Sequence, residues 1–223
     1  MGDFIGLKAS DGHELGAYLA EPAGAPRGGL IVGMEMYGVN DYLASVCDAF
    51  AAEGYLSIAP RLFDRFEPAL TLPYDEAGSA RGKELSAIID HDRTMLDVAA
   101  AAARVRPAGR VAIMGFCFGG TVAWLAACRC DLDGAIACYG SNMCDYPEEE
   151  PRCPVICHVG DRDTAVPPAD VAAFQTRHPE VHWYIYPGVQ HGFDNHTRPV
   201  RHDAAATALS RERSLAFLRE QIG

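Results

Sequence analysis

Three kinds of side chain in this sequence could together carry out acyl transfer. Cys117, an acid at Asp161 or Asp163, and His191 come in that order, each after a short apolar segment. The thiolate form of a cysteine attacks carbonyl carbons, an imidazole can accept the thiol proton, and a carboxylate can orient that imidazole and stabilise its cation. These residues predict a nucleophile, an acid and a base that act as one catalytic triad, with water hydrolysing the resulting thioester.

The residues around Cys117 favour a nucleophile. Residues 111–114 are apolar and predict a buried strand, and residues 121–127 form an apolar run of helical length. Between them, residues 115–119 read G-F-C-F-G, which places a thiol where the G-x-S-x-G motif has its serine. The two glycines allow the strained backbone that exposes such a nucleophile. The alternative interpretation is a small buried cysteine after a core strand.

The elements that must position these residues alternate between strands and helices. Strands are predicted at residues 4–8 and 14–19, which form a hairpin, and at 29–34, 55–60, 111–114, 134–139, 155–159 and 181–186. Helices are predicted at 41–53, 83–105, 121–127, 168–178 and 203–222, and residues 61–82 are expected to be irregular. The pattern predicts one α/β domain, residues 1–223, with a mainly parallel sheet of about eight strands and helices on both faces. Ligands then gather at the carboxyl ends of the strands, where the triad residues stand.

Composition and charge exclude several classes of protein. With 223 residues and 49% hydrophobic content, the chain can bury a full core. A net charge of −11 argues against nucleic acid and anionic membranes as partners, and no apolar run is long enough to span a membrane. The eight cysteines lack paired C-x-x-C spacing and follow no signal-peptide pattern, so they predict free thiols in a cytoplasmic protein. We expect no metal or organic cofactor, and a small ester or lactone bound by a monomer or small homo-oligomer.

Two further features concern the charge that develops during attack. An ester or lactone carbonyl would become an oxyanion, and the expected donors are the backbone N–H groups of Phe118 and Met36. Glu35 directly follows the strand predicted at 29–34 and would lie beside the nucleophile. Because a nearby negative charge disfavours ionisation of a thiol, Glu35 is predicted to hydrogen-bond to the resting thiol and to govern when the thiolate forms. The alternative is a solvated loop acid.

The order nucleophile, acid, histidine is that of the α/β-hydrolases. Among these, the sequence resembles the dienelactone hydrolases (carboxymethylenebutenolidases), which have a Cys-His-Asp triad. The resemblance covers nearly the whole chain and is carried by E-M-Y-G-V-N at 35–40, G-F-C-F-G-G at 115–120, D-T-A-V-P at 163–167, V-H-W-Y at 181–184, H-G-F at 191–193 and E-R-S-L-A-F-L at 212–218.

The resemblance implies roles for individual residues. By similarity, Cys117 is the nucleophile, His191 the base and Asp163 the orienting acid. Glu35 would be the glutamate that contacts the resting cysteine and moves aside when substrate binds, and the two oxyanion amides are those named above. The implied reaction opens 4-carboxymethylenebut-2-en-4-olide to maleylacetate in chlorocatechol breakdown.

The residues that would hold the substrate depart from the family pattern. Family members hold the substrate carboxylate with arginines, because a planar guanidinium binds a carboxylate through two parallel hydrogen bonds. One such arginine is expected four residues after the triad histidine, where this chain has Asn195, preceded by Asp194. Arg81 falls near the place expected for a second one, and Arg198 and Tyr37 are further candidates for substrate contacts.

Two alternatives to dienelactone hydrolysis remain open at this point. One is a broader carboxylesterase or thioesterase that uses the same triad on small esters. The other is a redox-sensing or ligand-binding protein in which Cys117 is oxidised instead of acylated. An oriented His-Asp pair together with Glu35 argues against the second alternative, because a sensor does not need them.

Overall fold

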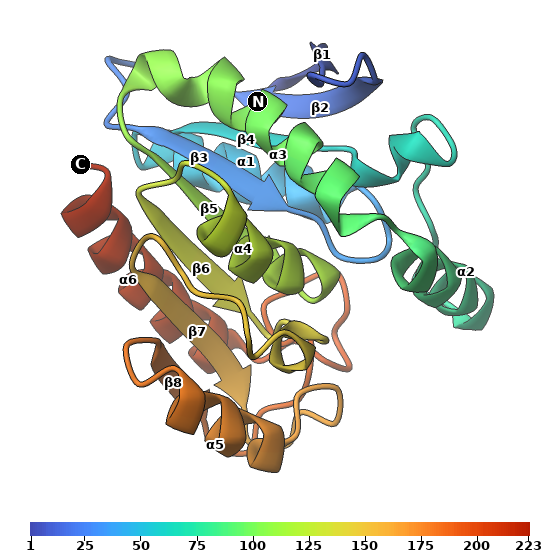
Figure 1. Ribbon diagram of the computed structural model, residues 1–223, viewed down its shortest axis with the longest axis vertical. Helices are drawn as coiled ribbons and strands as arrows, with labels where there is room; N and C mark the ends of the chain where they lie inside the picture. The colour runs from blue at the N-terminus through green and yellow to red at the C-terminus, as the bar shows by residue number, and fades with distance from the viewer.

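The computed structural model describes all 223 residues and contains one eight-stranded sheet between two layers of helices (Figure 1). The strands are β1 (Asp3–Lys8), β2 (Glu14–Ala20), β3 (Gly29–Gly33), β4 (Leu56–Pro60), β5 (Val111–Phe116), β6 (Gly134–Cys138), β7 (Val155–Gly160) and β8 (His182–Tyr186). Their order in the sheet is β1-β2-β4-β3-β5-β6-β7-β8. β2 pairs antiparallel with both β1 and β4, and the strands from β4 to β8 are parallel. The structure thus confirms the mainly parallel sheet and the N-terminal hairpin.

Helices cover both faces of the sheet. They are α1 (Asp41–Ala52), α2 (Glu76–Ile88), α3 (His91–Val105), α4 (Phe118–Arg129), α5 (Pro168–Arg177) and α6 (Ala204–Gln221). In Figure 1, α3 and α4 lie in front of the sheet and α1 and α6 behind it. Trp124 of α4 contacts Phe174 of α5, with 5.0 Å between ring centroids, so α5 shares the face of α4. On the other face, the guanidinium of Arg211 in α6 lies over the ring of Phe50 in α1.

The centre of the sheet is buried on both faces. Every residue of β3, β5, β6 and β7 is buried, which explains why these strands are apolar except at His158 in β7. The helix that follows Cys117 is also enclosed, because all its residues from Phe118 to Cys128 are buried. The turn between β5 and α4 is therefore held between two buried elements.

The helix predicted at 83–105 is wrong, because the structure has two helices there. α2 begins at Glu76, inside the segment expected to be irregular, and Asp75 caps it by accepting the N–H of Gly78. The chain then becomes extended at Ile89, and the side chain of Asp90 caps α3 by accepting two backbone N–H groups. An aspartate at this position favours a new helix start over continuation. As a result Ile88 is 59% exposed at the end of α2.

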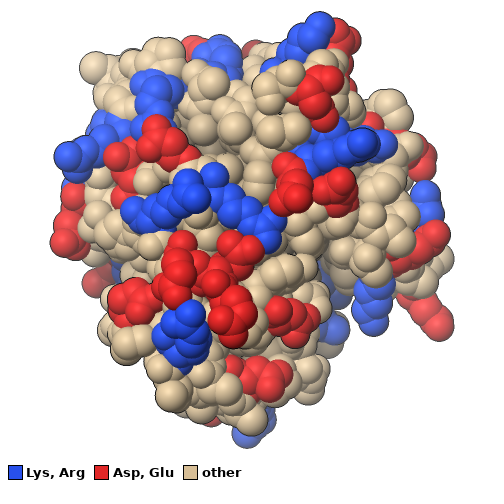
Figure 2. Space-filling model, viewed as in Figure 1, with Lys and Arg blue, Asp and Glu red and all other residues tan.

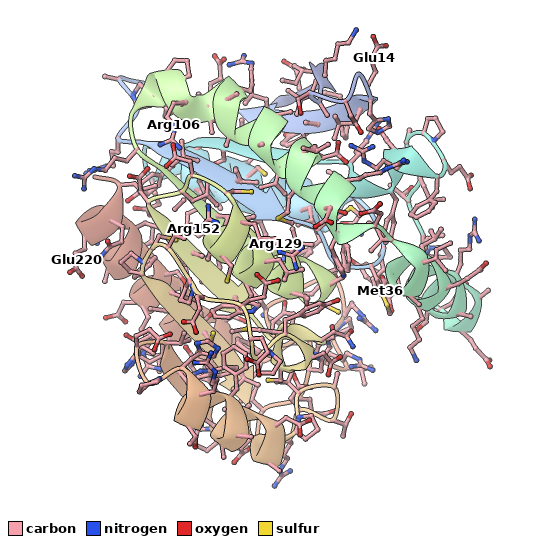
Figure 3. All side chains as sticks on the ribbon, in the orientation of Figure 1. Glu14, Met36, Arg106, Arg129, Arg152 and Glu220 are labelled. Carbon is pink, nitrogen blue, oxygen red and sulfur yellow. The ribbon has the colours of Figure 1, made fainter.

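Charges of both signs are interspersed on the surface. Figure 2 shows Lys and Arg alternating with Asp and Glu over the face viewed there, without a single basic patch. Several arginines of this face are ion-paired: Arg106, labelled in Figure 3, lies 2.9 Å from Asp133, and Arg129 lies 3.0 Å from Asp92. None of the helices combines the length and apolar character needed to cross a membrane.

Candidate active site

Cys117 occupies a tight turn at the carboxyl end of β5. Its φ of 54° and ψ of −116° are strained for a residue with a side chain. The neighbouring glycines make the turn possible, because a Cβ at Gly115 would lie 1.8 Å from the carbonyl oxygen of Gly119. A Cβ at Gly119 would lie 2.3 Å from the carbonyl oxygen of Gly33 in β3. The sequence pattern at 115–119 therefore has a steric cause, and this geometry is typical of a nucleophile elbow.

His191 and Asp163 form a directed hydrogen-bonded pair. The Nδ1 atom of His191 lies 2.8 Å from Oδ2 of Asp163, whose side chain is fully buried. The other oxygen, Oδ1, accepts the backbone N–H groups of Ala165 and Val166, at 2.8 and 3.0 Å. Asp161, the competing acid in the sequence, is exposed and accepts a backbone N–H from the loop after β8 instead. The geometry therefore pairs the histidine with Asp163.

The thiol of Cys117 is placed to ionise. Burial opposes ionisation, but the charge of His191, its hydrogen bond and that of the Ser141 hydroxyl bring the pKa of Cys117 below its usual value. The Sγ–Oγ distance to Ser141 is 3.1 Å. Burial lowers the pKa of His191, but the charges of Cys117 and Asp163 outweigh it and raise that pKa to about 10. The directions of the two pKa shifts favour a thiolate–imidazolium pair.

No other cysteine has this property. All eight thiols are free. Burial is the largest cause of a raised pKa at each of the remaining seven: Cys47, Cys128, Cys130, Cys138, Cys144, Cys153 and Cys157. Cys117 is therefore the one thiol of the chain whose pKa is lowered.

Glu35 lines the same cavity as Cys117 but forms no hydrogen bond to the thiol. It is 1% exposed, so it is not a solvated loop acid. Its Oε2 accepts hydrogen bonds from Asn195 Nδ2 at 2.8 Å and from the hydroxyl of Tyr74 at 3.2 Å. The expected hydrogen bond to Cys117 is absent because these two donors hold the carboxylate, and Ser141 takes the place beside the sulfur. Burial raises the pKa of Glu35.

Two backbone N–H groups are available near the thiol. Phe118 is the first residue of α4, where an N–H has no acceptor within the helix. The N–H of Met36, in the loop after β3, makes no hydrogen bond to the backbone. Both residues line one cavity with Cys117. The expected oxyanion donors therefore have no backbone acceptor and line the same cavity as Cys117.

The cavity has a volume of about 930 Å³ and brings most of the predicted residues together. Tyr37 and Arg198 both line it, and the guanidinium of Arg198 lies 5.2 Å from the ring of Tyr37 and 4.9 Å from that of Tyr74. Arg201 also lines it and donates a hydrogen bond to the carbonyl oxygen of His191. Arg201 was not predicted as a substrate contact, although it follows His191 closely in the sequence, as Arg198 does.

Arg81 is not part of this cavity. It lies on α2, where its Nη1 atom forms an ion pair with Glu84 at 2.9 Å, and its side chain is 41% exposed. The cavity wall formed by α2 consists instead of Ser79, Lys83 and Ser86 with their neighbours. The expectation was wrong because residue 81 lies on a helix, where the direction of a side chain follows the helical period. The family pattern indicated only the position of Arg81 in the chain and not the direction of its side chain.

Three residues that form hydrogen bonds to Cys117 or Glu35 were not predicted to do so. Ser141 follows β6 and Tyr74 lies in the segment expected to be irregular. Asn195 was considered only as the position where an arginine was expected. In the structure its side chain donates a buried hydrogen bond to Glu35. The signal for Ser141 was available, since it is a polar residue just after a parallel strand.

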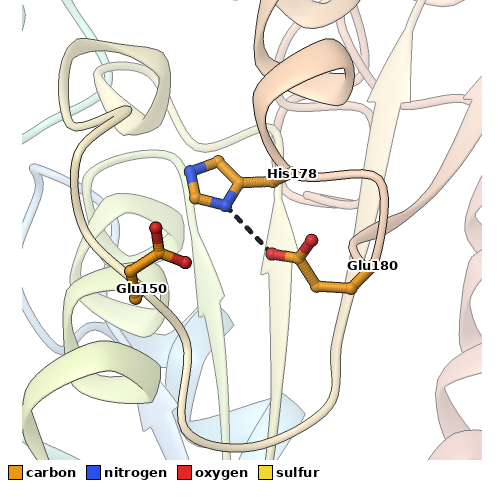
Figure 4. Close-up of side chains that lie close together, drawn as sticks. All are labelled: Glu150, His178 and Glu180. Atoms are coloured by element: carbon orange, nitrogen blue, oxygen red, sulfur yellow. Dashed lines mark hydrogen bonds and ion pairs between the residues drawn. The ribbon is translucent and has the colours of Figure 1, made fainter.

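A second polar cluster lies on the loop before β7 and at the end of α5 (Figure 4). The Nδ1 atom of His178 is 2.9 Å from Oε1 of Glu180, and its Nε2 is 2.8 Å from the carbonyl oxygen of Pro147. Glu150, the third member, forms an ion pair with Arg177 at 2.6 Å. Each acid already has a basic partner, so the cluster is a set of ion pairs and hydrogen bonds that fixes the loop.

The sequence matches the model of the dienelactone hydrolase family over residues 15–222. The chain belongs to this family. It is 31% identical to the carboxymethylenebutenolidase of Pseudomonas putida, over 96% of this chain and 94% of the relative. A relative from Azospirillum brasilense, assigned the same name, is 30% identical over 98% of this chain and 99% of its own length.

Solved structures agree with this family. A protein of Klebsiella pneumoniae that is assigned as a dienelactone hydrolase has a TM-score of 0.82 to this chain and 27% sequence identity, covering 96% of this chain and 98% of that one. The fold is therefore the α/β-hydrolase fold expected from the sequence. Family and fold together identify a hydrolase that acts on ester or lactone bonds.

Proposed function

We propose that the protein opens an unsaturated, carboxylate-bearing lactone, dienelactone, to maleylacetate through a Cys117-His191-Asp163 triad and a thioester intermediate. The observation that carries this proposal is the pairing of the one thiol of lowered pKa with a histidine that is oriented by a buried acid. The carboxymethylenebutenolidase names of the relatives support the substrate class. Breakdown of chlorinated aromatic compounds in a reducing cytoplasm is the corresponding setting.

In the first half of the reaction, the thiolate of Cys117 forms a bond to the lactone carbonyl carbon. The carbonyl electron pair moves to oxygen, where the N–H groups of Met36 and Phe118 stabilise the negative charge. When the carbonyl re-forms, the ring C–O bond breaks and the imidazolium of His191 gives its proton to the departing ring oxygen. The products of this half are a thioester and a free enol on the same acyl chain, which becomes the ketone of maleylacetate.

In the second half, water hydrolyses the thioester. The thiolate charge is the largest influence that raises the pKa of His191, and acylation removes it. The neutral imidazole can therefore accept a proton from water, whose oxygen attacks the thioester carbonyl. The C–S bond then breaks, the carboxylic acid product leaves, and the thiolate and imidazolium are restored.

Arg198 and Arg201 are the proposed partners of the substrate carboxylate. Both line the cavity that contains His191, whereas Arg81 does not. Stacking of Arg198 on Tyr37 and Tyr74 uses the face of its guanidinium and leaves the N–H edge for a carboxylate.

A broader carboxylesterase is the second candidate. Asn195 stands where an arginine was expected and Arg81 points elsewhere, so two of the anticipated carboxylate contacts are missing. The cavity of about 930 Å³ is also large enough for substrates bulkier than a dienelactone.

The two candidates are separated by the rates of opening of cis- and trans-dienelactone beside that of p-nitrophenyl acetate. We expect Cys117→Ala to lose both activities by about a thousandfold or more. Arg198→Met and Arg201→Met should each lower kcat/KM for the lactones by about tenfold and leave p-nitrophenyl acetate nearly unchanged, because only the lactone carries a carboxylate. Turnover of simple esters with weak lactone opening would favour the broader esterase.

A further inference from the structure

The carboxylate of Glu35 is fixed by hydrogen bonds from distant parts of the chain. Asn195 Nδ2 and the hydroxyl of Tyr74 both donate to its Oε2 atom. The Tyr74 hydroxyl itself accepts from Asn40 Nδ2 and Asn195 Nδ2, each at 2.8 Å. The amide oxygen of Asn195 is occupied by the backbone N–H and hydroxyl of Thr197, at 3.0 and 2.6 Å. The amide of Asn195 can therefore point only its NH₂ group at Glu35.

The sulfur of Cys117 has a different partner. The hydroxyl of Ser141 lies 3.1 Å from it and can donate to a thiolate. Glu35 acts in the opposite sense, because its negative charge raises the pKa of Cys117 even from its present position. Closer approach of that carboxylate would oppose the thiolate more strongly.

We propose that Asn195 and Tyr74 are positioning residues that hold the carboxylate of Glu35 apart from Cys117, so that the thiolate exists before substrate binds. The inference rests on the proposed role of Cys117 as nucleophile. It also assigns a function to Asn195. Where an arginine was expected to bind the substrate carboxylate, this chain has a neutral amide. Asn195 and Tyr74 together form a clamp on the buried carboxylate of Glu35.

The surroundings of Glu35 show why a clamp is needed. Burial disfavours its charge, whereas His191 and Arg198 favour it. The ionisable groups whose charges interact with Glu35 are Cys117, His191, Arg198, Tyr42, Tyr74 and Tyr139. The imidazolium of His191 attracts both Glu35 and the thiolate, so without the hydrogen bonds of the clamp the two anions would compete for one cation.

The test is the rate of alkylation of Cys117 by iodoacetamide as a function of pH, in the full chain without substrate. Mass spectrometry of the peptide that contains Cys117 gives the rate for this thiol alone. The variants are Asn195→Ala and Tyr74→Phe, each alone and combined with Glu35→Gln. Tyr37→Phe is the matched control, because its ring packs on Tyr74 at 4.5 Å without a hydrogen bond to Glu35.

Asn195→Ala and Tyr74→Phe should each slow alkylation at pH 7 by about three- to tenfold and move the profile to higher pH, while Tyr37→Phe leaves it in place. In the Glu35→Gln background, the same two changes should have no effect, because an amide carries no charge to oppose the thiolate.

Unchanged profiles in both single variants would overturn the proposal, as would equal slowing in the Glu35→Gln background, which indicates damage to packing. If Asn195→Ala does not fold, the half-buried Tyr74→Phe decides alone. The alkylation profile does not depend on ester turnover, so failure of the proposed hydrolysis would be seen separately, as the absence of an acyl group on Cys117.

Discussion

At the scale of single residues, the reactivity of Cys117 is a balance between burial and its neighbours. Burial and Glu35 both oppose the thiolate, and His191 and Ser141 both favour it. The pKa of Cys117 is lowered, so the effects of His191 and Ser141 together outweigh those of burial and Glu35. Each neighbour can be removed separately, which makes the balance testable.

Replacing His191 by Gln should move the alkylation of Cys117 to high pH. With the imidazolium gone, burial and Glu35 remain, so the pKa of the thiol rises above its ordinary value of about 8.5. At pH 7 we expect alkylation about a hundredfold slower than in the parent protein, whose thiolate persists because its pKa is lowered. The other seven thiols, whose pKa values burial raises, serve as internal controls. A profile unchanged in His191→Gln would contradict the ion pair.

Ser141→Ala should have a smaller effect in the same direction. The variant loses one hydrogen bond to the sulfur but keeps the imidazolium, so we expect alkylation at pH 7 and kcat for p-nitrophenyl acetate each to fall about three- to tenfold. Ser141→Thr keeps the hydroxyl and should restore most of both. Equal rates in Ser141→Ala and the parent protein would contradict a role of Ser141 in stabilising the thiolate.

At the scale of elements, the site depends on the close approach of α2 to the loop after β3. A Cβ at Gly82 of α2 would lie 2.4 Å from the carbonyl oxygen of Met36, the residue whose N–H is a proposed oxyanion donor. Figure 3 shows Met36 beside α2. The position of this helix and the geometry of the oxyanion site are thus linked.

Gly82→Ala should therefore lower kcat with little loss of stability. The methyl group must push Met36 or α2 aside, which weakens one oxyanion contact, whereas alanine favours the helix itself. We expect kcat for p-nitrophenyl acetate to fall about tenfold. Gly6→Ala, where a Cβ meets no atom within 4 Å, is the control. Parent-like kcat in Gly82→Ala would show that α2 and the oxyanion site are independent.

The sequence predicted the strands better than the segment that contains α2. Continuous apolar runs such as residues 111–114 have few alternatives to a buried parallel strand. Apolar residues recur at helical spacing through 85–98, and this pattern predicted a single helix. It did not reveal the break between α2 and α3, where Asp90 caps the start of α3. The pairing of Glu35 with Asn195 lay beyond prediction, since the two are 160 positions apart and no local pattern relates them.

At the scale of the whole molecule, Arg65 ties the N-terminal hairpin to the helical layer. Its guanidinium contacts Asp97 in α3 at 2.7 Å and Asp11, in the turn between β1 and β2, at 2.9 Å. The side chain of Asp97 is fully buried. This arrangement makes Arg65 a link between the hairpin and α3.

Arg65→Met should lower the free energy of unfolding by about 3–5 kcal/mol, because Asp97 would be left as a buried, uncompensated charge. Arg65→Met combined with Asp97→Leu should recover a large part of the loss. Urea denaturation measures both. Activity at low temperature should stay near that of the parent protein. A loss as great in the double variant as in Arg65→Met would contradict this explanation.

The most direct test of the central claim is the mass of the protein during turnover. The enzyme is mixed with a dienelactone or p-nitrophenyl acetate, quenched in acid within milliseconds to seconds, and analysed intact and after proteolysis. We expect one acyl group per chain, located on Cys117, formed and lost at rates compatible with kcat, and absent from Cys117→Ala. Turnover that continues in Cys117→Ala, or an acyl group on any other residue, would contradict it.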